Sequence, residues 1–121
     1  GWTGWATLLN SSNWTGYVTY IPRDRGSNTV STLSNLPTTK STVIANLSAA
    51  TSISVASGMN VGESITVICN PTASFTQPIP TTGSYKSMDG SSLSVTSRKQ
   101  FEINIYCYAS NTYSISCKVA K

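Results

Sequence analysis

The chain has 121 residues, which is enough for one domain with a single hydrophobic core. Ser and Thr make up 38 of these residues and only 10% are charged, whereas 39% are apolar, so the composition disfavours both long helices and disorder. The formal net charge at pH 7 is +4, but no run of basic residues exceeds two, which argues against a nucleic-acid-binding surface.

The first 27 residues form an aromatic-rich segment, in which Trp2-Thr3-Gly4-Trp5 recurs as Trp14-Thr15-Gly16-Tyr17. Short apolar runs predict strands at residues 5–9 and 17–21, followed by a long loop at 22–29. The chain begins with Gly1 rather than Met, from which we expect it to be a piece of a longer protein rather than a processed chain. Residues 1–121 are predicted to be a single β domain, with the aromatic-rich segment at 1–27 and the main β-sandwich at 28–121.

The middle of the chain predicts six strands separated by turns. They lie at residues 42–47, 52–56, 64–69, 74–79, 84–87 and 93–96. Val30 and Leu33 are spaced as on a helix before a proline, which favours a short helix or turn at 28–36. The sequence Met88-Asp89-Gly90 predicts a three-residue hairpin loop with Gly90 in the left-handed conformation, which would place Tyr85 opposite Leu93.

The C-terminal part shows the strongest alternation. One parity holds Phe101, Ile103, Ile105 and Cys107, and after a turn at 109–111 one parity holds Tyr113, Ile115, Cys117 and Val119. Alternation with period two predicts two half-buried strands, each with one face toward a core. Together, about ten short strands predict an all-β fold, namely an antiparallel β-sandwich of jelly-roll-like type.

The three cysteines lie on the apolar parities of their strands, which predicts small buried hydrophobic side chains. A three-residue loop at 109–111 would place Cys107 opposite Tyr113 and Cys117 opposite Ile103. These two cysteines would then lie roughly 13 Å apart along the strand pair, whereas a disulfide needs Cα atoms within about 7 Å. A bridge from Cys69 to either of them remains open. Free buried thiols favour folding in a reducing cytoplasm.

Side chains that carry chemistry are scarce. The chain has no His, no Cys-x-x-Cys pair and no glycine-rich phosphate loop, and its four carboxylates are scattered at Asp24, Glu63, Asp89 and Glu102. Ser and Thr are abundant but have few groups that would activate them as nucleophiles. We therefore predict that the protein is not an enzyme, has no metal site and uses no cofactor. No stretch approaches the roughly 20 apolar residues of a membrane helix, so membrane insertion is not expected.

Exposed aromatic side chains are the remaining candidates for a site. Trp14 and Tyr17 belong to the aromatic-rich segment, and Tyr106 and Tyr108 lie on the parity opposite the Ile face of their strand. Trp and Tyr rings stack on sugars and also pack in subunit contacts. These four residues are therefore candidate receptor-binding residues, and packing between subunits is the alternative role.

A succession of motifs runs through residues 30–119: LSNLP (33–37), VGESITV (61–67), QPIPTTGSY (77–85), SMDGSS (87–92), FEINI (101–105) and YSIS (113–116). This succession resembles the C-terminal domains of fibre proteins from tailed phages and prophages of Bacteroidetes-type gut bacteria. The aromatic-rich segment is not part of the resemblance. The resemblance implies a homotrimer on the virion, made in the bacterial cytoplasm, whose distal domain binds a host-cell glycan or outer-membrane protein.

Two other functions stay open from the sequence. One is a carbohydrate-binding module of a secreted bacterial protein, against which the expected free thiols argue. The other is a structural decoration domain of a capsid or fibre. The receptor-binding domain and the carbohydrate-binding module both predict cell or glycan binding, whereas the decoration domain predicts neither, and only the fibre domain requires a trimer.

Overall fold

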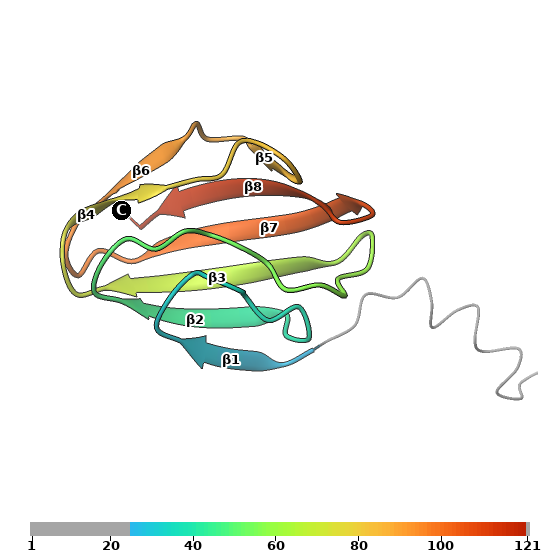
Figure 1. The fold of residues 1–121 in the computed structure, drawn as a ribbon. Coiled ribbons are helices and arrows are strands. Elements are labelled where there is room, and N and C mark those ends of the chain that lie inside the picture. The colour runs from blue at the N-terminus through green and yellow to red at the C-terminus, as the bar shows by residue number, and fades with distance from the viewer. Residues whose placement is uncertain (1–24, 121) are drawn as a thin grey trace, which may run out of the picture.

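The computed structural model describes residues 25–120, which form eight β-strands and no helix (Figure 1). Six strands form one sheet in the order β1-β2-β3-β7-β8-β5, and β4 and β6 form a second sheet. The predicted all-β, sandwich-like fold is confirmed. The strands are β1 (Ser27–Val30), β2 (Thr42–Leu47), β3 (Ser64–Pro71), β4 (Phe75–Pro78), β5 (Tyr85–Ser87), β6 (Ser92–Val95), β7 (Phe101–Ala109) and β8 (Thr112–Val119).

The six-stranded sheet is mixed. The pairs β1–β2, β2–β3 and β5–β8 are parallel, whereas β3–β7 and β7–β8 are antiparallel. The sequence predicts antiparallel, jelly-roll-like pairing, and the structure differs because the connections at 31–41 and 48–63 return the chain to the same end of the sheet. Parallel neighbours need such long crossovers, and here irregular loops make them in place of helices.

The core lies between one face of the six-stranded sheet and the layer formed by β4, β6 and the two long connections, which run across that face (Figure 1). In β3 and β7 buried residues alternate with less buried ones, as the sequence predicts for half-buried strands. The connections also contribute buried residues. The largest fully buried apolar side chains are Leu33, Leu36, Leu47, Ile65, Ile103, Ile105 and Ile115.

The β7–β8 hairpin has the register that the sequence predicts. Cys107 lies opposite Tyr113, and Cys117 lies opposite Ile103. The turn itself is shorter than predicted because Ala109 pairs with β8, and a β-bulge at residue 108 restores the register. The two cysteines are therefore far apart along the ladder, and both are free thiols in the structure.

Two central segments differ from their predictions. The segment 28–36, predicted as a short helix or turn, begins as the exposed strand β1 and turns only after residue 30. The predicted strand at 52–56 forms a single bridge, between Val55 and Leu36, instead of a strand. Beyond β1, the two segments are joined to each other by backbone hydrogen bonds between residues 33–36 and 54–56, and they bury single apolar residues such as Leu33, Leu36 and Ile53.

The predicted hairpin around Met88-Asp89-Gly90 is wrong. Gly90 has the expected positive φ of 86°, but β5 pairs with β8 and β6 pairs with β4. The Tyr85 ring stacks on Tyr113, with ring centroids 5.6 Å apart. The Asp89 carboxylate accepts a hydrogen bond of 2.6 Å from the backbone N–H of Cys117. These contacts hold the segment 85–89 along β8, away from β6.

The predicted strands at 5–9 and 17–21 and most of the predicted loop at 22–29 lie outside the described residues. Within residues 25–120, no helix is long and apolar enough to cross a membrane.

Cys69 and Cys107 are buried as the sequence predicts, whereas Cys117 is only half-buried. The burial of these thiols predicts low reactivity in the folded protein. Burial raises the pKa of Cys69 from 9.0 to about 12, and burial with the nearby Asp89 raises the pKa of Cys117 to about 11. At pH 8.5 we expect iodoacetamide to alkylate Cys69 at least 100-fold more slowly in the folded chain than in urea, because the thiolate reacts. Peptide mass spectrometry would measure this difference, and equal rates in both states would contradict the burial.

The raised pKa values of Cys69 and Cys117 also predict that the free energy of unfolding decreases at alkaline pH. Because the folded state keeps these thiols protonated, their contribution to the free energy of unfolding is fully present below about pH 9. It is lost as the pH rises from 9 toward 11 and 12.

Candidate functional site

The outward-pointing side chains of the six-stranded sheet form a surface that we call the outer face. They lie on the parity opposite the buried residues of their strands, and Ser, Thr and Asn predominate among them. The outer face comprises Ser27, Thr29, Thr42, Ile44, Asn46, Ser64, Thr66, Ile68, Asn70, Lys86, Glu102, Asn104, Tyr106, Tyr108, Ser114, Ser116 and Lys118.

Strand pairing arranges these side chains in rows across the sheet. One row joins Thr42, Thr66, Asn104 and Ser116. Within it Thr66 Oγ1 donates to Asn104 Oδ1 at 3.0 Å. Asn104 Nδ2 also donates to Oε1 of Glu102, two residues before it in β7, at 2.9 Å. Hydroxyl and amide groups fixed by their neighbours offer directional hydrogen bonds and lose little rotamer freedom on binding a ligand.

Tyr106 is at the centre of a second row, which runs Ser64–Tyr106–Ser114–Lys86 across β3, β7, β8 and β5. Its side chain is 46% exposed. Tyr108 is the extra residue of the β-bulge and is 39% exposed. The sheet therefore presents two tyrosines beside hydroxyl side chains at the end where β7 finishes.

Two of the four candidate receptor-binding residues are exposed, as the sequence predicts. Tyr106 and Tyr108 are exposed and point away from the Ile face of β7, as their parity predicts. Trp14 and Tyr17 lie outside the described residues. The structure thus brings Tyr106 and Tyr108 onto one polar surface, and their role in binding remains a prediction.

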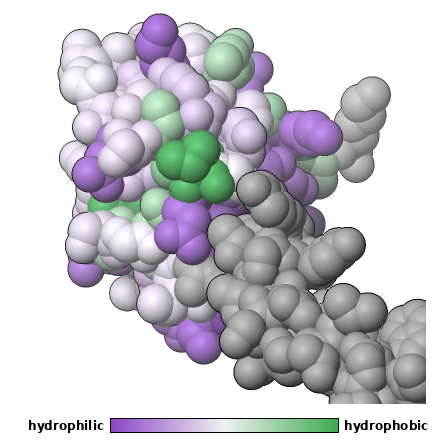
Figure 2. Space-filling view, turned by 90° about the vertical axis from the view of Figure 1, so that its right-hand side faces the viewer, coloured by the Kyte–Doolittle hydropathy of each residue, from purple (hydrophilic) through white to green (hydrophobic). Residues whose placement is uncertain are grey.

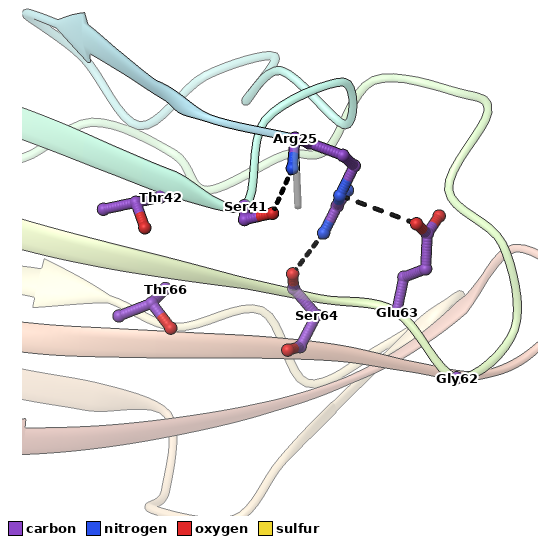
Figure 3. A pocket seen from close by; sticks show the side chains of 7 residues that line it. All are labelled: Arg25, Ser41, Thr42, Gly62, Glu63, Ser64 and Thr66. Carbon is purple, nitrogen blue, oxygen red and sulfur yellow. Dashed lines mark hydrogen bonds and ion pairs between the residues drawn. The ribbon is translucent and has the colours of Figure 1, made fainter. Parts of the chain in front are cut away.

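A pocket of about 300 Å³ lies at the start of β2 and β3 (Figure 3). Its lining is polar, and three of its residues also belong to the outer face: Thr42, Ser64 and Thr66. Ser64 is the pair partner of Tyr106, so the pocket adjoins the tyrosine row. The other lining residues are Arg25, Ser41, Gly62 and Glu63.

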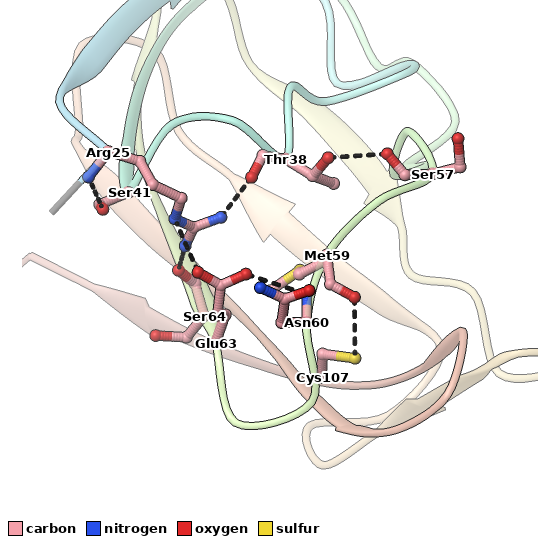
Figure 4. Close-up of polar contacts among 9 residues, drawn as sticks. All are labelled: Arg25, Thr38, Ser41, Ser57, Met59, Asn60, Glu63, Ser64 and Cys107. Carbon is pink, nitrogen blue, oxygen red and sulfur yellow. Dashed lines mark hydrogen bonds and ion pairs between the residues drawn. The ribbon is translucent and has the colours of Figure 1, made fainter. Parts of the chain in front are cut away.

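The wall of the pocket contains a buried ion pair (Figure 4). Arg25 Nε lies 3.5 Å from Glu63 Oε2, and the two side chains are only 5% and 7% exposed. The Arg25 guanidinium also donates to the carbonyl groups of Thr38 and Ser64. Glu63 Oε1 accepts a hydrogen bond of 2.9 Å from the backbone N–H of Asn60. Arg25 thus ties three segments together at the end of the sheet.

Sequence reasoning missed this pair. Arg25 falls in a predicted loop, and Glu63 counts there only as one of four scattered carboxylates. The available signal was the position of Glu63, directly before a strand with strong alternation. A carboxylate that is buried at such a position needs a partner of opposite charge.

This end of the molecule offers hydrogen-bonding groups and two exposed tyrosine rings. The Arg25 and Glu63 charges compensate each other, and the nearby nucleophile candidates are hydroxyls. Among residues 25–120, no group of three His, Cys, Asp or Glu side chains is placed to hold a metal ion. The arrangement is suited to binding a ligand that itself carries hydroxyl or amide groups.

Figure 2 shows the end of the molecule at which β2 and β3 begin. Pale and hydrophilic side chains predominate there, with a compact hydrophobic cluster near the middle of the view and smaller hydrophobic areas around it. Comparisons of the chain with family models, with curated proteins and with solved structures found no match.

Proposed function

We propose that this chain is a non-catalytic binding domain at the distal end of a phage fibre, and that it attaches to a glycan on the surface of the host cell. The observation that carries the proposal is the outer face: a broad sheet surface of fixed hydroxyl and amide groups with exposed Tyr106 and Tyr108. Aromatic rings stack on sugar rings, and directional polar groups meet the sugar hydroxyls.

A glycan suits this surface better than an outer-membrane protein. Protein interfaces usually have an apolar core surrounded by a polar rim. The outer face instead carries polar side chains in its rows, and Ile44 and Ile68 lie only half-buried between them. Shallow glycan sites bind weakly one at a time. A homotrimer, as proposed from the family resemblance, would raise the overall affinity by holding three sites together.

Binding to host cells tests the proposal at Tyr106. We expect Tyr106→Ala to weaken binding of the labelled domain to cells about tenfold, or about 1.4 kcal/mol, because the stacking surface is lost. Tyr106→Phe keeps the ring and should retain most of the binding. Thr76→Ala, an exposed position in β4 of the second sheet, is the matched control and should bind as the unaltered chain does.

The oligomeric state of each variant separates the alternatives. Light scattering should give a mass near three times 12.9 kDa for the unaltered chain and for all three variants. If Tyr106→Ala abolishes the trimer as well as binding, the ring is part of a subunit contact. A domain that binds no cells would fit a decoration role, and one that binds as a monomer would fit a carbohydrate-binding module.

A further inference from the structure

The tyrosine row of the outer face ends in a cation. Lys86 is exposed and follows Ser114 in the row, on the side away from Ser64. The alternation fixes its direction, because its neighbour Tyr85 points inward and stacks on Tyr113. Lys86 and Tyr106 therefore lie on the same side of the sheet with one strand between them.

The ammonium group of Lys86 makes no ion pair within residues 25–120, where the described pair joins Arg25 to Glu63. Glu102 is the one acid of the outer face. It pairs in register with Lys118, and its carboxylate accepts a hydrogen bond from Asn104. Glu102 also lies four residues from Tyr106 along β7, or roughly 13 Å at the rise of a strand. The nearest acid to Lys86 along the chain, Asp89, accepts a hydrogen bond from the backbone N–H of Cys117. The end of the outer face at Tyr106 therefore carries the ammonium group of Lys86 without an ion-pair partner within residues 25–120.

The spacing of the row fits a sugar with a charged substituent. Adjacent strands lie about 4.8 Å apart, which places the backbones of Tyr106 and Lys86 roughly 10 Å from each other. A sugar ring over Tyr106 would have the hydroxyls of Ser64 and Ser114 on either side. An anionic group on that sugar, or on the next one, would come within reach of the flexible lysine side chain.

We propose that the glycan bound at the outer face is acidic, with its ring on Tyr106 and its anionic group at Lys86. This inference rests on the proposed function and adds the class of ligand. An ammonium group attracts a carboxylate and a sulfate alike, so the shared chemistry is a saccharide that carries an anionic substituent. The two sources of that charge are separated by the choice of probe.

The experiment titrates the domain with three defined probes and follows binding by NMR. They are tri-galacturonic acid, its fully methyl-esterified form, which has the same rings without charge, and a sulfated galactose oligosaccharide. We expect the acid to bind at least tenfold more tightly than the ester at low salt, and the difference to shrink as salt is added. Binding of the sulfated probe but not of tri-galacturonic acid would support the inference with sulfate as the anion.

Three variants assign the preference to Lys86. Lys86→Gln should bind the acid and the ester equally, whereas Lys86→Arg should keep the preference. Lys99→Gln changes the net charge by the same amount at an exposed position in the connection between β6 and β7, and it should also keep the preference. A preference that survives Lys86→Gln overturns the inference, as does the absence of binding to both anionic probes.

The probe titration and the cell-binding experiment distinguish failure of this inference from failure of the proposed function. If acid and ester bind equally and Tyr106→Ala weakens both, the ligand is a neutral glycan and the proposed function stands. If Tyr106→Ala leaves binding to host cells unchanged, the proposed site itself is wrong.

Discussion

Replacing Glu63 by Gln should destabilise the domain by about 3–5 kcal/mol, because the change leaves the buried Arg25 guanidinium without a counter-charge. Both side chains are more than nine-tenths buried, so water cannot replace the lost carboxylate. The amide oxygen of Gln can still accept the hydrogen bond from the backbone N–H of Asn60. The substitution therefore removes mainly the negative charge. Urea unfolding followed by circular dichroism, at one protein concentration for all variants, measures the effect.

The matched control is Glu102→Gln on the outer face. Glu102 is half-buried and faces Lys118 across the strands, so the same change should cost less than about 1 kcal/mol. The double variant Arg25→Met with Glu63→Gln should be destabilised by less than the sum of the two single changes, because it leaves no isolated buried charge. An unchanged urea midpoint for Glu63→Gln would show that the carboxylate does not stabilise the fold.

Strand bounds and the register of the tight hairpin were predictable where the local alternation is strong. The bounds of β2 agree at both ends with residues 42–47, and the register of the β7–β8 hairpin agrees at Cys107 and Cys117. In both cases local alternation defines which side chains turn inward, and in the hairpin the short turn also leaves one register that buries them. The shortened turn and the bulge at Tyr108 have no such local signal.

Pairing between distant segments was not predictable. Nothing in the alternation of β1, β2 and β3 indicates that they are parallel neighbours, because a strand with one buried face has the same pattern in either direction. The β5–β8 pair depends on the Tyr85 ring stacking on Tyr113 and on Asp89 reaching the backbone of Cys117. Such contacts form only once the sheet is assembled, and a local hairpin rule favours β5–β6 instead.

The same distinction applies to the candidate site. Exposure of Tyr106 and Tyr108 follows from parity within one strand, so the sequence contains it. The row that joins Tyr106 to Ser114 and Lys86 requires the order of three strands, and one of its pairings is parallel. The pocket beside it requires Arg25 and Glu63 to meet from different segments. Sequence therefore indicates the type of surface, and the fold supplies the neighbours that give it specificity.

Gln77 should be another sensitive position, because its side chain is fully buried and links β4 to the connection at 48–63 within the layer that covers the sheet. From β4, its Nε2 donates to the carbonyl groups of Thr51, at 2.6 Å, and Pro78, at 2.9 Å. Its Oε1 accepts from the backbone N–H of Thr51 at 3.4 Å. Gln77→Leu keeps the approximate volume but leaves these backbone groups without their partner, at a cost of about 2–4 kcal/mol.

A second substitution at the same position distinguishes lost hydrogen bonds from altered packing. Gln77→Glu has nearly the same shape, but its carboxylate would face two carbonyl oxygens at pH 7 and could donate to neither. Burial should raise the pKa of the new carboxyl group, because it disfavours the charged form. The folded state then favours the protonated form, so the variant should be less destabilised at pH 4 than at pH 7. The control is Gln100→Leu, because Gln100 is exposed and its side chain donates to Asn70 Oδ1 at the surface. This change should cost less than about 1 kcal/mol. Equal urea midpoints for Gln77→Leu and Gln100→Leu would mean that the connection at 48–63 is held to β4 by apolar packing alone.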